Sequence, residues 1–263
     1  MTAPILPGAE PFSHDGGPLG VLVLHGFTGS PQSVRPQAEA LAAAGYTVEL
    51  PLWPGHGTSV EDMIPTRWPD WSEAAEAAFR DLAGRCDAVA LFGLSMGGTL
   101  ACWLAEHHPE IRGLCLVNPM VDPPAESFRD VLRAMLEGGA EVAPGVGSDI
   151  AMAGRQELAY PGTPLAAALS LFEGVDTVAA HLGQISCPVL VLSSREDHVV
   201  PSSSSDVLCA GVAGPAERVW LEKSYHVATL DHDEAEICHR AVEFAGRVLG
   251  APSGDEMGAR TPS

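Results

Sequence analysis

Val89-Ala-Leu-Phe-Gly-Leu-Ser-Met-Gly-Gly98 is the stretch of sequence that decides the fold of this chain. Its first five residues are apolar or small and predict a buried strand, and the five residues from Gly93 to Gly97 fit the pattern Gly-x-Ser-x-Gly centred on Ser95. A helical pattern follows from Thr99. A serine held between a strand and a helix in this pattern is typical of a sharp turn that pushes the hydroxyl out above the sheet edge.

Ser95 is therefore a candidate nucleophile. The flanking glycines are explained by the turn, because bulky side chains two residues before or after the serine would clash. A serine hydroxyl is a weak nucleophile until a base takes its proton. The pattern also occurs by chance, so a catalytic interpretation needs a base, an acid and hydrogen-bond donors elsewhere in the chain.

The charge of the chain argues against several classes of partner. The 263 residues include 34 acidic and 14 basic ones, giving a formal net charge of −20, and Lys223 is the single lysine. Nucleic acid is not an expected partner, because phosphate binding is driven by basic residues. Tight docking on anionic lipid is disfavoured for the same reason. A chain of this length buries about 70–75% of its unfolded surface, so we expect it to fold without a metal or a disulfide.

The sequence also predicts where the protein resides. Its six cysteines form no Cys-x-x-Cys pair, and several lie inside apolar runs, so we expect reduced structural thiols. The N-terminal segment lacks the basic and apolar regions of a signal peptide. No run approaches the ~18 apolar residues of a membrane span. We expect a cytoplasmic protein with a disordered tail at 251–263, where Gly, Pro and Ser are frequent.

Apolar runs and helical patterns alternate along most of the chain, which predicts an α/β fold. The mostly parallel central sheet would be flanked by helices on both faces. Expected strands cover 20–24, 46–50, 88–92, 113–117, 188–192 and 218–221. Expected helices cover 30–44, 99–107, 202–210 and 234–249, and another starts at Asp70, with Glu73 completing a capping box.

The alternation stops between about residues 118 and 184. Helical stretches are expected there at 127–136 and 164–172, joined by Gly- and Pro-rich loops without a clear strand. We therefore expect a core made of residues 1–118 and 185–250. A small, wholly helical cap at 119–184 would be inserted after the strand at 113–117, at one end of the sheet.

A candidate acid and a candidate base follow Ser95 in the order Ser, acid, His, each in a loop after a later strand. Asp197 and Glu196 are the acid candidates, and the loop position favours Asp197. His226 lies just before the last helix. As general base it would take the Ser95 proton, while Asp197 would hold the imidazole in the correct tautomer and stabilise the imidazolium.

His226 competes with nine other histidines. Three of these lie at surface positions on predicted helices. His198 directly follows Asp197, and neighbouring side chains diverge, so it is a poor partner for that carboxylate. His25 and His56 lie in loops after early strands, where structural hydrogen bonding is the better explanation.

A site of this kind also needs two N–H groups for a tetrahedral oxyanion. One is expected from Met96, the residue after the nucleophile, at the start of the helix. The other is expected from the loop His25-Gly-Phe-Thr-Gly-Ser30, where Phe27 is our choice. Losing one such donor typically costs ~3 kcal/mol in the barrier.

The motifs together resemble those of a known family. They are His25-Gly-Phe-Thr-Gly-Ser30, Pro54-Gly-His-Gly57, Gly93-Leu-Ser-Met-Gly-Gly98, Asp197-His-Val-Val-Pro201 and Ser224-Tyr-His-Val-Ala-Thr-Leu-Asp231. From about residue 18 to 249 the chain resembles the bacterial monoacylglycerol lipase and carboxylesterase branch of the α/β-hydrolase superfamily. The resemblance implies an α/β-hydrolase fold with a small helical cap, a Ser95–Asp197–His226 triad, and an oxyanion hole formed by Phe27 and Met96.

The resemblance extends into the cap. Gln156-Glu-Leu-Ala-Tyr160 is similar to a segment that places a glutamate near the alcohol part of the substrate in these lipases. Glu157 would then accept a hydrogen bond from a glycerol hydroxyl; an exposed cap carboxylate is the equally supported alternative. The glycine-rich stretch 138–147 departs from the family pattern, which leaves the preferred acyl length open.

We expect a serine hydrolase without cofactor or metal that cleaves carboxylic esters through an acyl-enzyme. The expected substrate is a monoacylglycerol, giving a fatty acid and glycerol. Alternatives are a general short- or medium-chain carboxylesterase and an acyltransferase; a ligand-binding receptor on an inactive hydrolase scaffold is disfavoured by the intact set of catalytic residues. We expect a lipid ester as the small-molecule partner, at most transient membrane contact through the cap, and a monomer or homodimer.

Overall fold

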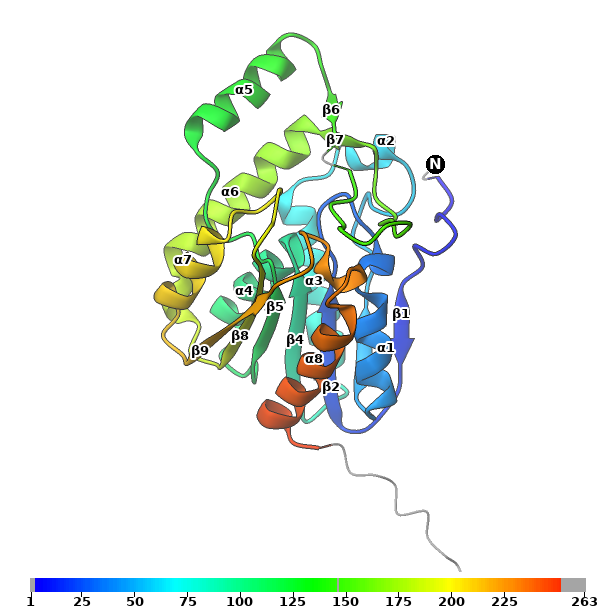
Figure 1. Ribbon diagram of the computed structural model, residues 1–263, viewed down its shortest axis with the longest axis vertical. Coiled ribbons are helices and arrows are strands. Elements are labelled where there is room, and N and C mark those ends of the chain that lie inside the picture. The colour runs from blue at the N-terminus through cyan, green and yellow to red at the C-terminus, as the bar shows by residue number, and fades with distance from the viewer. Residues whose placement is uncertain (1–2, 146, 252–263) are drawn as a thin grey trace, which may run out of the picture.

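The computed structural model describes residues 3–145 and 147–251 (Figure 1). The tail expected at 251–263 lies outside the described residues, except for residue 251. A seven-stranded sheet forms the centre, with strand order β1-β3-β2-β4-β5-β8-β9. β1 runs antiparallel to β3, and the other neighbouring pairs of this sheet are parallel. The predicted mostly parallel sheet is confirmed.

The elements follow the predicted order closely. The strands of the sheet are β1 (Phe12–His14), β2 (Leu19–Leu24), β3 (Thr47–Leu50), β4 (Ala88–Leu94), β5 (Leu114–Val117), β8 (Val189–Ser194) and β9 (Ala216–Leu221). The α-helices outside the insertion are α1 (Arg35–Ala43), α2 (Val60–Met63), α3 (Trp68–Ala83), α4 (Met96–His107), α7 (Ser203–Gly211) and α8 (Glu234–Leu249). Short 3-10 helices are η1 (Pro31–Val34) and η3 (Ala228–Leu230).

Both faces of the sheet are buried, which explains the continuous apolar strands in the sequence. Successive side chains of a strand point to opposite faces. In β2, Leu22 and Leu24 join the hydrophobic cluster that contains α3 and α4, whereas Val21 and Val23 join the cluster that contains α1 and α8. The sheet therefore lies between two helical layers (Figure 1).

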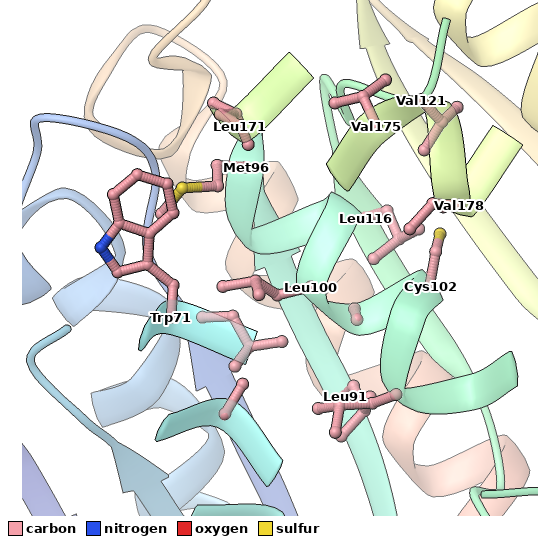
Figure 2. Close-up of a cluster of buried hydrophobic side chains, with 14 of the residues drawn as sticks. Trp71, Leu91, Met96, Leu100, Cys102, Leu116, Val121, Leu171, Val175 and Val178 are labelled. Carbon is pink, nitrogen blue, oxygen red and sulfur yellow. The ribbon is translucent and has the colours of Figure 1, made fainter. Parts of the chain in front are cut away.

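Helix α4 lies in the larger of these clusters. Figure 2 shows Leu100 of α4 on the sheet side, Trp71 of α3 beside Met96, and Leu171 and Val175 of α6 above. These five side chains are all buried. Because α4 begins directly after Ser95, its dense packing holds the first turn of the helix and the serine in place.

The described residues of the insertion between β5 and β8 form two helices and two short strands. They are α5 (Glu126–Glu137), β6 (Val142–Pro144), β7 (Gly162–Pro164) and α6 (Leu165–His181), with η2 (Leu182–Gln184) at the exit. Figure 1 draws α5, β6 and β7 at the top of the molecule, beyond the carboxyl ends of the parallel strands. β6 and β7 pair in antiparallel fashion. The prediction of a wholly helical insertion is therefore wrong, because three-residue strands that contain Pro and Gly are too short to produce an alternating pattern.

Helix α6 has the apolar composition of a helix that could span a membrane. Residues Leu165–Gln184 could cross a membrane by length and composition, but half of the stretch is buried inside the fold. The helix packs on α3 and α4, and a Cβ atom added at Gly174 would lie 2.2 Å from the ring of Trp68. This close approach is that of a core helix.

Local details differ from the sequence expectations at three places. Asp70 does not start α3: it is the third residue, and its carboxylate accepts a hydrogen bond from the N–H of Arg67 at 2.8 Å. The helix expected at 30–44 opens with the 3-10 turn η1 before α1. β1 and α2 were not predicted, since three or four residues give no usable periodicity.

Candidate active site

Ser95 lies in the tight turn between β4 and α4. Its φ is 55° and its ψ is −118°, a conformation that non-glycine residues rarely adopt. Strain of this kind persists only where the surrounding structure enforces it, and it concentrates at functional sites. The side chain does not cap α4, so the hydroxyl is not engaged in holding the helix.

The glycines around Ser95 are required by backbone contacts. A Cβ atom at Gly93 would lie 2.5 Å from the carbonyl oxygen of Gly97. A Cβ atom at Gly97 would lie 2.0 Å from the carbonyl oxygen of Leu24 and 3.0 Å from that of His25. The first contact comes from the turn itself, as the sequence suggested. The second comes from the loop after β2, which passes directly beside the serine turn.

Asp197 and His226 meet at the carboxyl edge of the sheet. His226 Nδ1 lies 2.8 Å from Asp197 Oδ2, and the two side chains are 8% and 2% exposed. The other oxygen, Oδ1, accepts hydrogen bonds from the N–H groups of Val199 at 2.8 Å and Val200 at 2.7 Å. The carboxylate is therefore held by its own loop and aimed at the imidazole. Glu196, the rival acid, is exposed.

Asn118 joins this pair to the serine turn. Its Nδ2 donates to the carbonyl oxygen of His226 at 2.8 Å, and its Oδ1 accepts from the N–H of Ser194 at 2.8 Å. On either side of Asn118, the Val117 carbonyl accepts from Ser95 N–H at 3.0 Å and the Met120 N–H donates to the Ser95 carbonyl at 3.4 Å. One buried amide thus fastens the residue after β5 to the end of β8 and to the His226 loop.

The loop after β2 lies against Ser95 on the opposite side. A Cβ atom at Gly26 would be 3.5 Å from the Ser95 Cβ, so the Phe27 backbone that follows is close to the nucleophile. Met96 is the first residue of α4, where the N–H has no acceptor within the helix. The Phe27 ring packs edge-on against His56 and Trp71, which braces the loop.

His25 and His56 support that loop and do not titrate near neutral pH. Nδ1 of His25 donates to the Gly26 carbonyl at 2.9 Å and Nε2 accepts from Trp53 N–H at 3.3 Å, which assigns a neutral tautomer. Burial lowers the pKa of His25 well below its ordinary value and that of His56 to about 4. Both histidines are structural, in agreement with the sequence interpretation.

Glu157 approaches the site from the segment between β6 and β7. A Cβ atom at Gly29, in the loop after β2, would be 2.7 Å from Glu157 Oε1. Burial raises the pKa of Glu157 to about 7, against the smaller opposing effects of the His226 charge and a hydrogen bond with Ser33. The exposed-carboxylate alternative does not fit, because Glu157 is partly buried and points towards this loop.

Several carboxylates surround His226 and affect its pKa. Burial by itself would lower its pKa, but the hydrogen bond and charge of Asp197, together with the charges of Glu157 and Asp149, raise the pKa above its usual 6.5. The imidazolium is thus the favoured charge state to a higher pH than in a free histidine. An arrangement that stabilises an imidazolium suits a base that must hold a proton temporarily.

Comparison with known proteins shows the family. The family model described as serine aminopeptidase, S33 matches residues 19–233, which include the serine turn, the Asp197 loop and the His226 loop. The chain belongs to this family.

Three similar proteins have names that refer to ester or lipid hydrolysis. A thermostable monoacylglycerol lipase from Bacillus sp. (strain H-257) is 46% identical over 251 residues, covering 94% of this chain and 98% of the relative. A carboxylesterase from Bacillus subtilis (strain 168) is 28% identical, covering 89% and 94%. A solved structure whose description names LipS and LipT, two metagenome-derived lipolytic enzymes, has a TM-score of 0.89 to this chain. It is 42% identical, and the match covers 93% of this chain and 100% of the solved chain.

These findings confirm the predicted α/β-hydrolase fold and the predicted relationship to bacterial monoacylglycerol lipases and carboxylesterases. The chain is a serine hydrolase of the lipase and esterase type. The roles of the single residues stay predictions. Asp197 and His226 are in direct contact, and the Ser95 backbone bonds to Val117 and Met120, on either side of the Asn118 that holds His226. Glu157 lies beside Gly29 in the loop that carries Phe27.

Three polar residues near the site of this S33 family member were not identified from the sequence. Asn118 directly follows an apolar strand, a position that could have marked it. Asp149 and Asp231 accept hydrogen bonds from several backbone N–H groups of loops distant in sequence, and no spacing rule predicts such contacts.

Proposed function

We propose that this enzyme hydrolyses monoacylglycerols to a fatty acid and glycerol, with Ser95, His226 and Asp197 as its catalytic triad. The observation that carries the proposal is the 2.8 Å contact between His226 Nδ1 and Asp197 Oδ2, at the sheet edge where the strained Ser95 turn lies. The 46% identical monoacylglycerol lipase supports the choice of substrate. The proposed reaction needs neither a metal nor a cofactor.

The first half of the reaction forms an acyl-enzyme. Ser95 Oγ attacks the ester carbonyl carbon while its proton passes to Nε2 of His226. The N–H groups of Phe27 and Met96 stabilise the negative charge on the carbonyl oxygen. When the tetrahedral intermediate collapses, the bond to the glycerol oxygen breaks and His226 gives its proton to that oxygen.

The second half releases the fatty acid. A water molecule enters, loses a proton to His226 and attacks the acyl carbon; the proton then returns to Ser95 Oγ as the acyl bond breaks. Asp197 stays ionised throughout. Its hydrogen bond keeps the proton of the neutral imidazole on Nδ1, which leaves Nε2 free to accept the serine proton.

The reaction rate should increase as His226 loses its proton. Its pKa is raised by Asp197, Glu157 and Asp149 against the effect of burial, and the imidazolium cannot act as base. Activity is thus expected to be low in acid and to increase with pH through a midpoint above 6.5. A kcat/KM profile from pH 5 to 9 on a soluble ester checks this, and a flat profile would contradict the assignment of the base.

We propose that Glu157 binds the glycerol end of the substrate. Its carboxyl lies beside Gly29 in the loop that supplies Phe27, and its pKa of about 7 means that it can accept or donate a hydrogen bond near neutral pH. A hydroxyl of the leaving glycerol, held by this carboxyl, would be oriented near the proton on His226. A simple ester without hydroxyls makes no such contact.

Replacing Glu157 should therefore separate two substrate classes. Glu157→Ala is expected to lower kcat/KM for a monoacylglycerol by about 10-fold, the effect of one charge-assisted hydrogen bond, and to leave the p-nitrophenyl ester of the same acid nearly unchanged. Parallel assays of both substrates measure the ratio. Glu173→Ala, which removes an exposed carboxylate elsewhere in the insertion, serves as the control and should leave both rates unchanged. Equal losses on both substrates in Glu157→Ala would remove the glycerol role.

The insertion at 119–184 is proposed as the cap that covers the acyl chain. Phe172 is buried, whereas Phe128 and Val131 are 50% and 55% exposed on α5. Helix α5 lies at the top of the molecule (Figure 1), and its exposed apolar side chains favour transient contact with a membrane or lipid aggregate. Residence in the cytoplasm and a monomeric or homodimeric state are part of the same proposal.

Three other reactions are included in the test. The 28% identical carboxylesterase supports a broader short- or medium-chain esterase, and the family description names an aminopeptidase. An acyltransferase would use the same acyl-enzyme with an alcohol in place of water.

A matched substrate panel decides among these functions. The purified enzyme is assayed on monoacyl-, diacyl- and triacylglycerols, a simple alkyl ester of the same acid, and an aminoacyl anilide. We expect the highest kcat/KM on the monoacylglycerol and none on the anilide. Equal rates on the alkyl ester would favour the carboxylesterase, and ester exchange that outruns hydrolysis in added alcohol would favour the acyltransferase.

A further inference from the structure

We infer that Asp149 is a positioning residue for the base, through which the insertion controls the alignment of His226. The inference rests on the proposed role of His226. Asp149 lies in the segment between β6 and β7, which also carries Glu157, and is outside the serine, acid and histidine motifs. Figure 1 shows this green segment beside the orange loop that leads to α8.

The main chain of His226 is held from two directions. Its carbonyl oxygen accepts from Nδ2 of Asn118, which belongs to the core, at 2.8 Å. Its N–H donates to Oδ2 of Asp149, which belongs to the insertion, at 3.0 Å. The next N–H, that of Val227, donates to the backbone carbonyl of Asp149 at 3.0 Å. The backbone of the base is therefore fixed only when both parts are in place.

Asp149 reaches the acid loop as well. Its Oδ2 also accepts from the N–H of His198 at 3.2 Å, and its Oδ1 lies 2.8 Å from His198 Nδ1. His198 directly follows Asp197, so one carboxylate touches both loops that carry the Asp197–His226 pair. The Asp149 side chain is 12% exposed, whereas His198 is 57% exposed.

A reciprocal contact strengthens the connection. Asp231, at the end of the His226 loop, accepts from Ala151 N–H at 2.7 Å and Met152 N–H at 2.9 Å in the insertion, and from Tyr225 N–H at 2.9 Å in its own loop. Asp231 is 1% exposed. The two segments therefore hold each other, and a displacement of residues 149–152 would be transmitted to the imidazole.

This arrangement has a consequence for catalysis. The segment that contacts the substrate through Glu157 is the same one that aligns the base, so His226 is competent when the segment is seated on the core. A misalignment of about 1 Å can cost about 100-fold in rate. Asp149 also contributes charge: with Asp197 and Glu157, it is one of the three carboxylates that raise the pKa of His226.

Two substitutions at Asp149 separate alignment from charge. Asp149→Ala removes both acceptors, and we expect kcat per titrated active site to fall by about 10–100-fold with KM for a small p-nitrophenyl ester unchanged. Asp149→Asn keeps an oxygen that can accept from the His226 N–H but removes the charge. We expect near-normal kcat at high pH, with the acid limb of the profile displaced to lower pH.

The controls distinguish this inference from the proposed function. Asp122→Asn, which changes an acidic residue of the insertion bonded to Ser203, should keep the wild-type kcat and profile. Active-site titration with a fluorophosphonate means that kcat is calculated for folded enzyme alone. If Asp149→Ala only destabilises the fold, kcat per titrated site stays at the wild-type value, and this result would refute the inference. A wild-type acid limb in Asp149→Asn also refutes it. If wild-type enzyme is not labelled at Ser95, or His226→Ala retains activity, the proposed function itself fails.

Discussion

Ser95→Ala should reduce ester hydrolysis by about 10³- to 10⁶-fold, because no other group in the proposed mechanism can form the acyl-enzyme. The fold should survive the change. Ser95 makes no capping hydrogen bond with α4, and alanine retains the Cβ that packs beside Gly26. The strain at φ 55° is shared by both residues, so the melting temperature should stay close to that of the wild type.

Two measurements check this expectation. Steady-state hydrolysis of a monoacylglycerol gives the loss of kcat, and labelling by a fluorophosphonate followed by peptide mapping shows whether Ser95 is the modified residue. Ser13→Ala, on the exposed edge strand β1, is the matched control and should retain full activity and labelling. Near-normal turnover by Ser95→Ala would refute the nucleophile assignment.

Asp197→Asn should lower kcat by about 10⁴-fold through the tautomer of His226. Oδ1 of Asp197 accepts from the N–H groups of Val199 and Val200, so the oxygen of an asparagine would occupy that position. Its NH₂ group would then replace Oδ2 and face Nδ1 of His226. Because the NH₂ group is a donor, Nδ1 must be unprotonated, and the imidazole proton then lies on Nε2. A protonated Nε2 can no longer accept the proton of Ser95.

The adjacent carboxyl provides the control for this experiment. Glu196→Gln changes an exposed acid on the same loop and should leave kcat within about twofold, as expected for a surface substitution. NMR of the imidazole protons would show the tautomer exchange in Asp197→Asn. If Glu196→Gln and not Asp197→Asn abolished activity, the rival acid considered at the start would be the correct one.

The sequence predicted the strand, turn and helix that carry the candidate nucleophile because its signals are local. A strand, a Gly-x-Ser-x-Gly turn and a helix are adjacent along the chain, and the glycines record the backbone contacts of the turn. Asp197 and His226 could be chosen because the family order is preserved and each follows a recognisable strand. The sequence could not show that Gly97 also serves the approach of the Leu24 carbonyl, since that contact joins segments far apart.

The insertion was predicted less accurately. β6 and β7 are stabilised by pairing with each other across a long loop, and three residues are too few for periodicity to show. The apolar positions Phe128 and Leu132 follow the same helical pattern on α5, yet the first is exposed and the second buried. Residues four apart lie on the same face of a helix, so how much of that face meets the core depends on the surrounding elements.

The sequence by itself determined the fold class, the family and the candidate nucleophile, acid and base, because these depend on residue type, local spacing and order along the chain. Only the tertiary structure decided how the base is held. Asn118 and Asp149 lie 108 and 77 residues from His226, and their single hydrogen bonds leave no pattern in the sequence. The raised pKa of His226 is likewise a sum of burial and charges from separate loops, which exists only after the chain has folded.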